Sequence, residues 1–228
     1  MTKSFIKRDN MKLIDLTHTI DNNMPVYPGT EGPSITPATT YEKDGYKETL
    51  LHMFSHVGTH MDAPAHLLDG HKTLDEFGPE QFVGSAIIID CRHLKEGEKI
   101  TMSEVFSKGE DVAKKAEYLV FMTGWDKRWG DESYFGDYPV VTDEVADFAI
   151  ETGKKGLAFD VIGLDPISDL NLTLHKKVFA ASDMVIIENL CNLDKVEEAA
   201  MGKEFTLIAT PIKYKNADGA PIRALAMI

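Results

Sequence analysis

The sequence predicts a single α/β domain, and three observations lead to that prediction. The chain has 228 residues, which is close to the usual size of one domain. Its composition, 43% hydrophobic and 27% charged, is that of an ordinary globular protein. Short β-type runs alternate with helical runs, and no repeat or Pro/Gly/Ser-rich linker divides the chain. One mixed, layered domain over residues 1–228 is therefore expected.

The expected strands are runs rich in β-branched and aromatic residues, bounded by Gly, Pro or Asp. They cover residues 12–17, 49–56, 83–90, 118–123, 157–161, 184–188, 205–210 and 222–228. Between residues 21 and 45 the chain is rich in Pro, Gly, Thr and Asn, which predicts a long irregular loop. Long loops in compact domains usually carry function, so this segment is a candidate part of a binding site.

Three expected helices have recognisable ends. Thr101 opens a capping box ahead of an apolar pair. Thr142 precedes a run with helical spacing that Gly153 ends. A third helix is expected over about residues 194–201.

The charge and the cysteines limit the partners and the compartment. The formal net charge is −13, whereas phosphate-rich partners require clustered basic side chains, so neither nucleic acid nor a membrane surface is expected as a partner. The first ten residues lack an apolar signal segment, and no apolar run approaches the ~18 residues of a membrane span. Cys91 and Cys191 lie far apart beside apolar runs, which favours buried free thiols in a cytoplasmic protein over a disulfide.

Five of the eight histidines fall within residues 52–71. In an extended chain, His56, His60 and Asp62 share one face at period two, and Gly58 between them leaves room for an ion. A helix would contain Gly58 and would point Asp62 away from the histidines, so the strand is favoured. Two imidazoles and one carboxylate are the usual ligands of catalytic Zn, Mn or Fe(II) with open positions. The segment therefore predicts a metal site.

Two later residues are further candidate ligands. His175 opens a possible short helix, and Glu188 ends an apolar strand, where a charge is costly unless it is paired or bound to a metal. Each is a weak signal alone. His52 and His71 fit the pattern less well and are interpreted as structural or supporting residues.

These residues resemble a known family. The run His56-Val-Gly-Thr-His60-Met-Asp62-Ala-Pro-Ala-His66 is similar to the HxGTHxDxPxH signature of the cyclase-like metal-dependent hydrolases, which include bacterial kynurenine formamidase and isatin hydrolase. Further segments that resemble family elements are DLTH at 15–18, PVYPG at 25–29, TGW at 123–125, GLDPISD at 163–169, ENLCNL at 188–193 and DGAPIRA at 218–224. The resemblance covers nearly the whole chain.

The resemblance implies a β-barrel-like core of mixed sheet flanked by helices, assembled as a homodimer or homotetramer. It implies that His56, His60 and Asp62 hold one divalent metal, Zn²⁺ or Mn²⁺, with Asp62 able to bridge. His175 and Glu188 would complete a second metal position, as in the formamidase branch, whereas the isatin hydrolase branch is thought to use one manganese. One or two ions per chain are therefore expected.

The resulting functional hypothesis is hydrolysis of an amide-type C–N bond by metal-activated water. The substrate would be an aryl formamide such as N-formylkynurenine, or a cyclic amide. The resemblance makes His66 the proton donor and acceptor, and an imidazole pKa near ~6.5 suits both directions. Tyr27 and Trp125 are candidate contacts to a planar small-molecule substrate, with a position in the core as the alternative for Trp125.

Two other interpretations of the same residues stay open. His60, Asp62 and the distant His175 imitate the HxD…H triad of non-haem iron oxygenases. Such enzymes that use 2-oxoglutarate need an arginine soon after the distal histidine, whereas Lys176 and Lys177 follow here. A non-catalytic protein that binds a metal or a small ligand is the other interpretation, which a metal saturated by protein ligands would favour.

Overall fold

The computed structural model describes residues 11–228. Residues 1–10, which the single-domain prediction and the signal-segment argument included, lie outside the described residues. The main sheet is built from β1 (Leu13–Asp15), β4 (His60–Asp62), β5 (Val83–Asp90), β7 (Tyr118–Met122), β9 (Gly156–Phe159), β10 (Val185–Glu188), β11 (Phe205–Pro211) and β12 (Gly219–Met227). Seven of these strands close into a ring in the order β12-β11-β5-β7-β9-β10-β4, because β4 pairs back onto β12, while β1 pairs with β12 outside the ring. The expected barrel-like mixed sheet is confirmed.

Strands in one half of the ring are buried on both faces. β5, β7, β9 and β10 run parallel to one another, and the other pairings are antiparallel. Along β5, Ala86 and Ile88 pack inside the barrel, whereas Ile87 and Ile89 pack in a second core outside it. Burial of both faces explains why these strands read as continuous apolar runs in the sequence.

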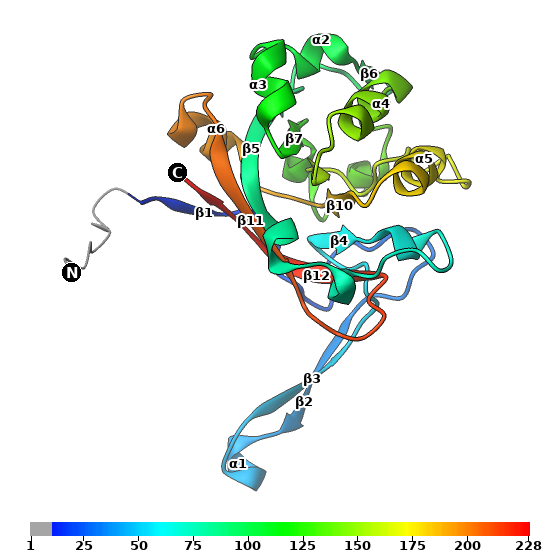
Figure 1. Ribbon diagram of the computed structural model, residues 1–228. Coiled ribbons are helices and arrows are strands. Elements are labelled where there is room, and N and C mark those ends of the chain that lie inside the picture. The colour runs from blue at the N-terminus through cyan, green and yellow to red at the C-terminus, as the bar shows by residue number, and fades with distance from the viewer. Residues whose placement is uncertain (1–10) are drawn as a thin grey trace, which may run out of the picture.

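Helices cover the outer face of this half. They are α2 (Met102–Val105), α3 (Glu110–Lys115), α4 (Asp143–Glu151) and α5 (Thr173–Ala181), grouped on one side of the sheet in Figure 1, and α6 (Leu193–Ala200) lies apart from them. The predicted capping box at Thr101 is present, with Glu104 bonded back to the Thr101 amide. Thr142 is the N-cap residue of α4 by position, although its side chain makes no capping hydrogen bond.

The segment expected as one long loop contains regular structure, which corrects the prediction for residues 21–45. β2 (Ser34–Thr39), α1 (Tyr41–Asp44) and β3 (Glu48–His52) form a two-stranded hairpin that projects from the body of the molecule (Figure 1). The predicted strand over 49–56 accordingly ends at His52. β2, which falls in the expected loop, has no buried residue and so lacks the one-sided burial by which a strand is recognised in a sequence.

Smaller elements complete the fold. The short strands β6 (Lys99–Ile100) and β8 (Val140–Val141) pair in parallel, and a 3₁₀ turn over Pro64–His66 follows β4. Both cysteines are buried and free, as predicted. None of the helices within residues 11–228 has the length and apolar run that a membrane crossing requires.

Candidate active site

The site is built on the outer face of β4. Because side chains alternate along a strand, His60 and Asp62 point outward while Met61 is fully buried inside the barrel. Strand β10 pairs antiparallel with β4 and places Glu188 directly opposite His60. The predicted shared face of His60 and Asp62 is confirmed, and Glu188 joins it from a strand more than a hundred residues away.

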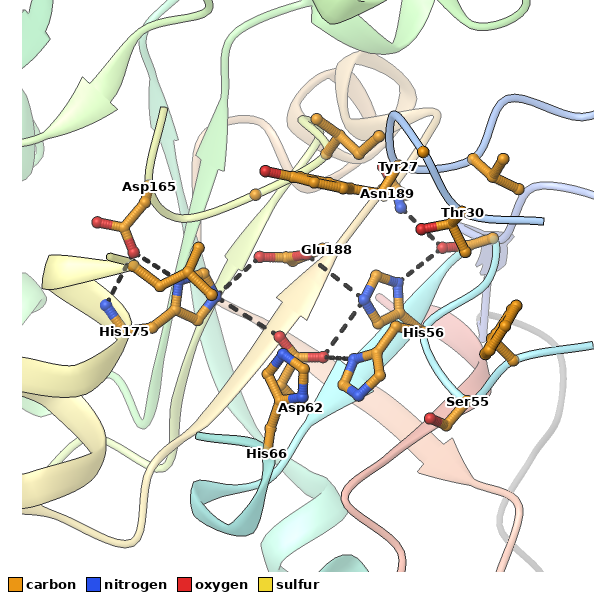
Figure 2. A pocket seen from close by; sticks show the side chains of 18 of the residues that line it. Tyr27, Thr30, Ser55, His56, Asp62, His66, Asp165, His175, Glu188 and Asn189 are labelled. Atoms are coloured by element: carbon orange, nitrogen blue, oxygen red, sulfur yellow. Dashed lines mark hydrogen bonds and ion pairs between the residues drawn. The ribbon is translucent and has the colours of Figure 1, made fainter. Parts of the chain in front are cut away.

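The two carboxylates each face two histidines (Figure 2). For Asp62, Oδ1 lies 3.3 Å from His60 Nε2, and Oδ2 lies 3.5 Å from His175 Nε2. Glu188 repeats the arrangement, with Oε2 at 3.4 Å from His60 Nε2 and Oε1 at 3.1 Å from His175 Nε2. Ligand atoms about 2.0–2.1 Å from a tetrahedral ion are separated by about 3.4 Å. The distances between the atoms of these four side chains therefore fit the coordination of a divalent metal ion.

Hydrogen bonds at Nδ1 orient the imidazoles of His60 and His175. His60 Nδ1 donates to the Gly58 carbonyl at 2.9 Å, and His175 Nδ1 donates to Asp165 Oδ2 at 2.6 Å. Each bond leaves Nε2 free to face the carboxylates. Such partners fix the tautomer and the ring orientation of a metal-binding histidine.

Asp165 also determines where α5 begins. Its two oxygens accept the backbone N–H groups of Leu174 at 2.7 Å and His175 at 3.0 Å, in the first turn of the helix. A carboxylate at this end satisfies free backbone donors and interacts favourably with the helix dipole. One buried residue therefore starts the helix and orients the histidine that the helix carries to the site.

His56 reaches the site differently from the prediction. β4 begins only at His60, and Gly58 has φ +64°, so the extended strand expected from His56 to Asp62 is wrong over its first half. His56 comes from the preceding loop, with Nδ1 2.6 Å from Asp62 Oδ1 and Nε2 3.0 Å from Asp218 Oδ2. A Cβ at Gly219 would overlap the His56 ring, so that glycine makes room for it.

His66 lies beside the metal-ligand candidates. Pro64 occupies the first position of the 3₁₀ turn that follows β4, and the turn brings the His66 ring to 3.9 Å from the His56 ring. Its Nδ1 lies 3.9 Å from Asp218 Oδ2. Burial, together with the charges of His56 and His175, lowers the pKa of His66 to about 4, so this imidazole is neutral at neutral pH.

Burial and neighbouring charges have opposite effects on the pKa values of His56 and Asp62. Burial disfavours a charged His56, but Asp62 and Asp218 outweigh it and raise the pKa of His56 to about 10. Burial also disfavours an ionised Asp62, yet the neighbouring histidines hold the pKa of that carboxyl well below its usual range. Without metal, protons on the histidines therefore balance the buried carboxylates.

The site opens into a cavity of about 800 Å³. Tyr27, the candidate substrate contact, lines its mouth and is 37% exposed. Trp125 does not line it: the ring is buried in the core, and Nε1 donates to the Tyr134 carbonyl at 2.9 Å. The structure thus places Trp125 in the core position that was its alternative. His52 and His71 also lie outside the cavity lining.

Three residues that support the site were absent from the predicted set. Asp165 and Asp218 hold His175 and His56, and Asn189 Nδ2 donates to the Gly58 carbonyl at 2.8 Å. All three lie in segments already quoted for the family resemblance, which was the available signal. Nothing in their local pattern marks them as neighbours of a metal site.

A buried set of imidazoles and carboxylates that opens onto a cavity is the arrangement of metal-dependent enzymes with open coordination positions. The family model described as "Putative cyclase" matches residues 14–166, and the chain belongs to that family. It is 31% identical to the kynurenine formamidases of Bacillus cereus, over 93% of this chain and 95% of the relative, and of Bacillus anthracis, over 94% and 96%.

Solved structures show the same fold. Isatin hydrolase A from Labrenzia aggregata, with benzyl benzoate bound, superposes with a TM-score of 0.84 at 26% identity, covering 96% of this chain and 94% of that one. A predicted metal-dependent hydrolase from Bacillus stearothermophilus gives a TM-score of 0.76 at 26% identity, covering 95% and 98%.

Proposed function

We propose that this chain is a metal-dependent hydrolase of amide-type C–N bonds, acting on an aryl formamide or a cyclic amide. The observation that carries the proposal is that Asp62 and Glu188 each face both His60 and His175, on the wall of a cavity. The relatives named kynurenine formamidase and isatin hydrolase A support it, since a formamide and isatin each contain an amide bond.

The proposed metal content is two divalent ions, Zn²⁺ or Mn²⁺. The two oxygens of each carboxylate point to different histidines, which supports one position beside His60 and another beside His175. His56 would join the position beside His60 through Asp62 Oδ1. Metal analysis tests the number: about two equivalents are expected, and Glu188→Gln should retain fewer. Two equivalents bound equally tightly by wild type and Glu188→Gln would contradict the assignment.

A bound divalent ion supplies an acidified water and polarises the carbonyl of the substrate. The chain's own part is proton transfer by His66, which is neutral and lies beside the ligand set. His66 takes a proton as water attacks the carbonyl carbon, and returns it to the nitrogen as the C–N bond breaks. Tyr27 provides a flat apolar surface at the mouth for the aromatic part of the substrate.

The oxygenase interpretation receives less support. His60, Asp62 and His175 do converge, but Glu188 and His56 join the same set and would have no role in a three-ligand iron site. None of the described residues that line the cavity is an arginine, the partner that a 2-oxoacid cosubstrate needs.

Turnover of a small panel tests the proposed reaction. Metal-stripped protein, refilled with Zn²⁺ or Mn²⁺, is assayed with N-formylkynurenine, isatin, formanilide and a cyclic imide. Hydrolysis of at least one member, lost on chelation and restored by metal, is expected. If refilled wild-type protein hydrolyses none of them, the proposed reaction is wrong.

The oligomeric state and the compartment are also proposals. We propose a homodimer or homotetramer formed through the β2–β3 hairpin, because an isolated two-stranded hairpin is marginal in water. Leu50 and Leu51 are 59% and 54% exposed, and as strand neighbours they face opposite sides, so both faces offer apolar surface. Light scattering should show an oligomer that dissociates in the L50K/L51K double variant and stays intact in Val112→Lys, a matched change on α3.

The free thiols of Cys91 and Cys191 support a cytoplasmic location.

A further inference from the structure

The charges that line the cavity are of one sign. Its carboxylates belong to Glu31, Asp62, Asp165, Glu188 and Asp218, and none of the described residues that line it is a lysine or an arginine. With the histidines neutral, as the imidazole ligands of a metal are, these five groups carry a formal charge of −5, which two divalent ions would reduce to −1 and a single ion to −3. The cavity thus remains negative even with metal bound.

The residual charge lies toward the mouth. Asp62, Asp165 and Glu188 are buried and face the histidines, so bound metal would compensate their charges. Glu31 is exposed, and the side chain of Asp218 is 44% exposed. Asp218 Oδ2 lies 3.0 Å from His56 Nε2, at the edge of the ligand candidates.

The rest of the lining is largely apolar. Val26, Tyr27, Phe54 and Leu170 contribute to the wall, and Phe54 and Leu170 are more than half exposed. An aromatic ring can pack against such a surface, but an anionic substituent on that ring would meet Glu31 or Asp218, and the described part of the lining offers no lysine or arginine to pair with it. Desolvating an unpaired charge is unfavourable, and like charges add to the cost.

We infer that this site selects amides whose aromatic part is neutral or cationic, and disfavours substrates that carry an anionic group on that part. The inference rests on the proposed hydrolase function and names the substrate class within it. Glu31 is the specificity-determining residue, because it is the exposed acid at the mouth and is not engaged with the histidines.

A charge series of one substrate tests the inference. The metal-loaded protein is assayed with formanilide, its 4-sulfonate and its 4-trimethylammonium derivative, which share the scissile bond. We expect kcat/KM for the sulfonate to be lower than for formanilide by roughly tenfold or more, with the cation equal to formanilide or better. Raising the ionic strength from about 0.01 M to about 1 M should reduce the difference in kcat/KM between formanilide and its sulfonate, since the screening length falls from about 30 Å to about 3 Å.

Variants of the mouth sharpen the test. Glu31→Gln should reduce the formanilide-to-sulfonate ratio of kcat/KM, and Glu31→Lys should reduce it further. Glu151→Gln, which removes an exposed acid at the end of α4, is the matched control and should leave the ratio as in wild type.

The outcomes separate the two proposals. Equal kcat/KM for all three compounds, or a preference for the sulfonate that Glu31→Lys leaves unchanged, overturns the charge inference while the hydrolase function stands. If none of the three is hydrolysed, binding of the matching 4-substituted acetanilides to metal-loaded protein is measured by calorimetry. Equal affinity for the neutral, cationic and anionic compounds then overturns the charge inference, and tighter binding of the neutral and cationic ones supports it.

Discussion

His60 and Glu188 are direct partners across the antiparallel pair of β4 and β10, and their side chains meet on the outer face of the barrel with 3.4 Å between Nε2 and Oε2. This register places a carboxylate from the second half of the chain beside the histidine segment. The neighbouring pair in the same register joins Ile186 to Asp62, so the outer face changes from apolar core to metal site within one strand.

Loss of the residue behind His175 should weaken metal binding. In Asp165→Asn, the Nδ1 partner of His175 loses its charge, and we expect metal affinity to fall by about 10–100-fold. Competition with a chromogenic chelator measures this directly. Asp169→Asn is the matched control, since Asp169 is in the same loop and accepts the Thr173 amide at the start of α5 but is only half-buried. Equal metal affinity in Asp165→Asn and Asp169→Asn would show that Asp165 does not support metal binding.

Replacing the proposed proton carrier should affect turnover and spare the metal. For His66→Gln we expect kcat to fall by about 10²–10⁴-fold, the usual contribution of a positioned acid or base. Metal content should stay at the wild-type level, because His66 is placed beside the ligand set and not in it. His71→Gln, which changes an exposed histidine outside the cavity lining, should leave kcat unchanged. Wild-type turnover in His66→Gln would exclude the role.

A side chain at Gly58 should damage both stability and the metal site. Its φ of +64° strains any L-residue by about 1–2 kcal/mol, and the new Cβ would lie 3.2 Å from Ile20 Cγ1. The carbonyl that orients His60 would shift with it. Gly45→Ala is the control, because Gly45 has φ +76° but open space around it. Urea unfolding should show a larger loss for Gly58→Ala than for Gly45→Ala, and only the former should lose metal. Equal losses would show that packing at Gly58 is unimportant.

The metal-free protein should lose stability as pH rises through the neutral range. Despite the opposing effect of burial, Asp62 and Asp218 raise the pKa of His56 in the folded chain to about 10, against about 6.5 when unfolded. The folded state therefore holds a proton that the unfolded state releases, so this stabilising contribution is complete below about pH 6.5 and is lost toward about pH 10.

Urea unfolding of chelator-treated protein across that pH range measures the effect. His56→Gln should flatten the pH dependence, whereas His93→Gln, which changes an exposed surface histidine, should not. Stability of the metal-free wild type that stays constant or rises over the range would be evidence against the charge balance described for the site.

Much of the fold was predictable because its strands and helices follow from short patterns of neighbouring residues. The apolar run at 83–90 became β5 with the predicted bounds, and Thr101 caps α2 as expected. β2 was missed because it has no buried face, and its pairing with β3, most of which lies in the strand predicted over 49–56, was missed with it. The turn at Gly58 was missed because a glycine is compatible with both an extended strand and a positive φ.

The sequence by itself determined the grouping of the candidate metal ligands with the candidate proton carrier, since His56, His60, Asp62 and His66 are close along the chain and need no long-range contact to be grouped. Tertiary structure alone decided that Glu188 lies opposite His60, that Asp165 holds the helix carrying His175, and that Trp125 is in the core. The physical reason is that the alternation of side chains along a strand and the capping of a helix depend only on residues that are close in the sequence. Cross-strand register and helix docking depend on which distant apolar faces are buried together, and a single chain's local pattern does not specify that.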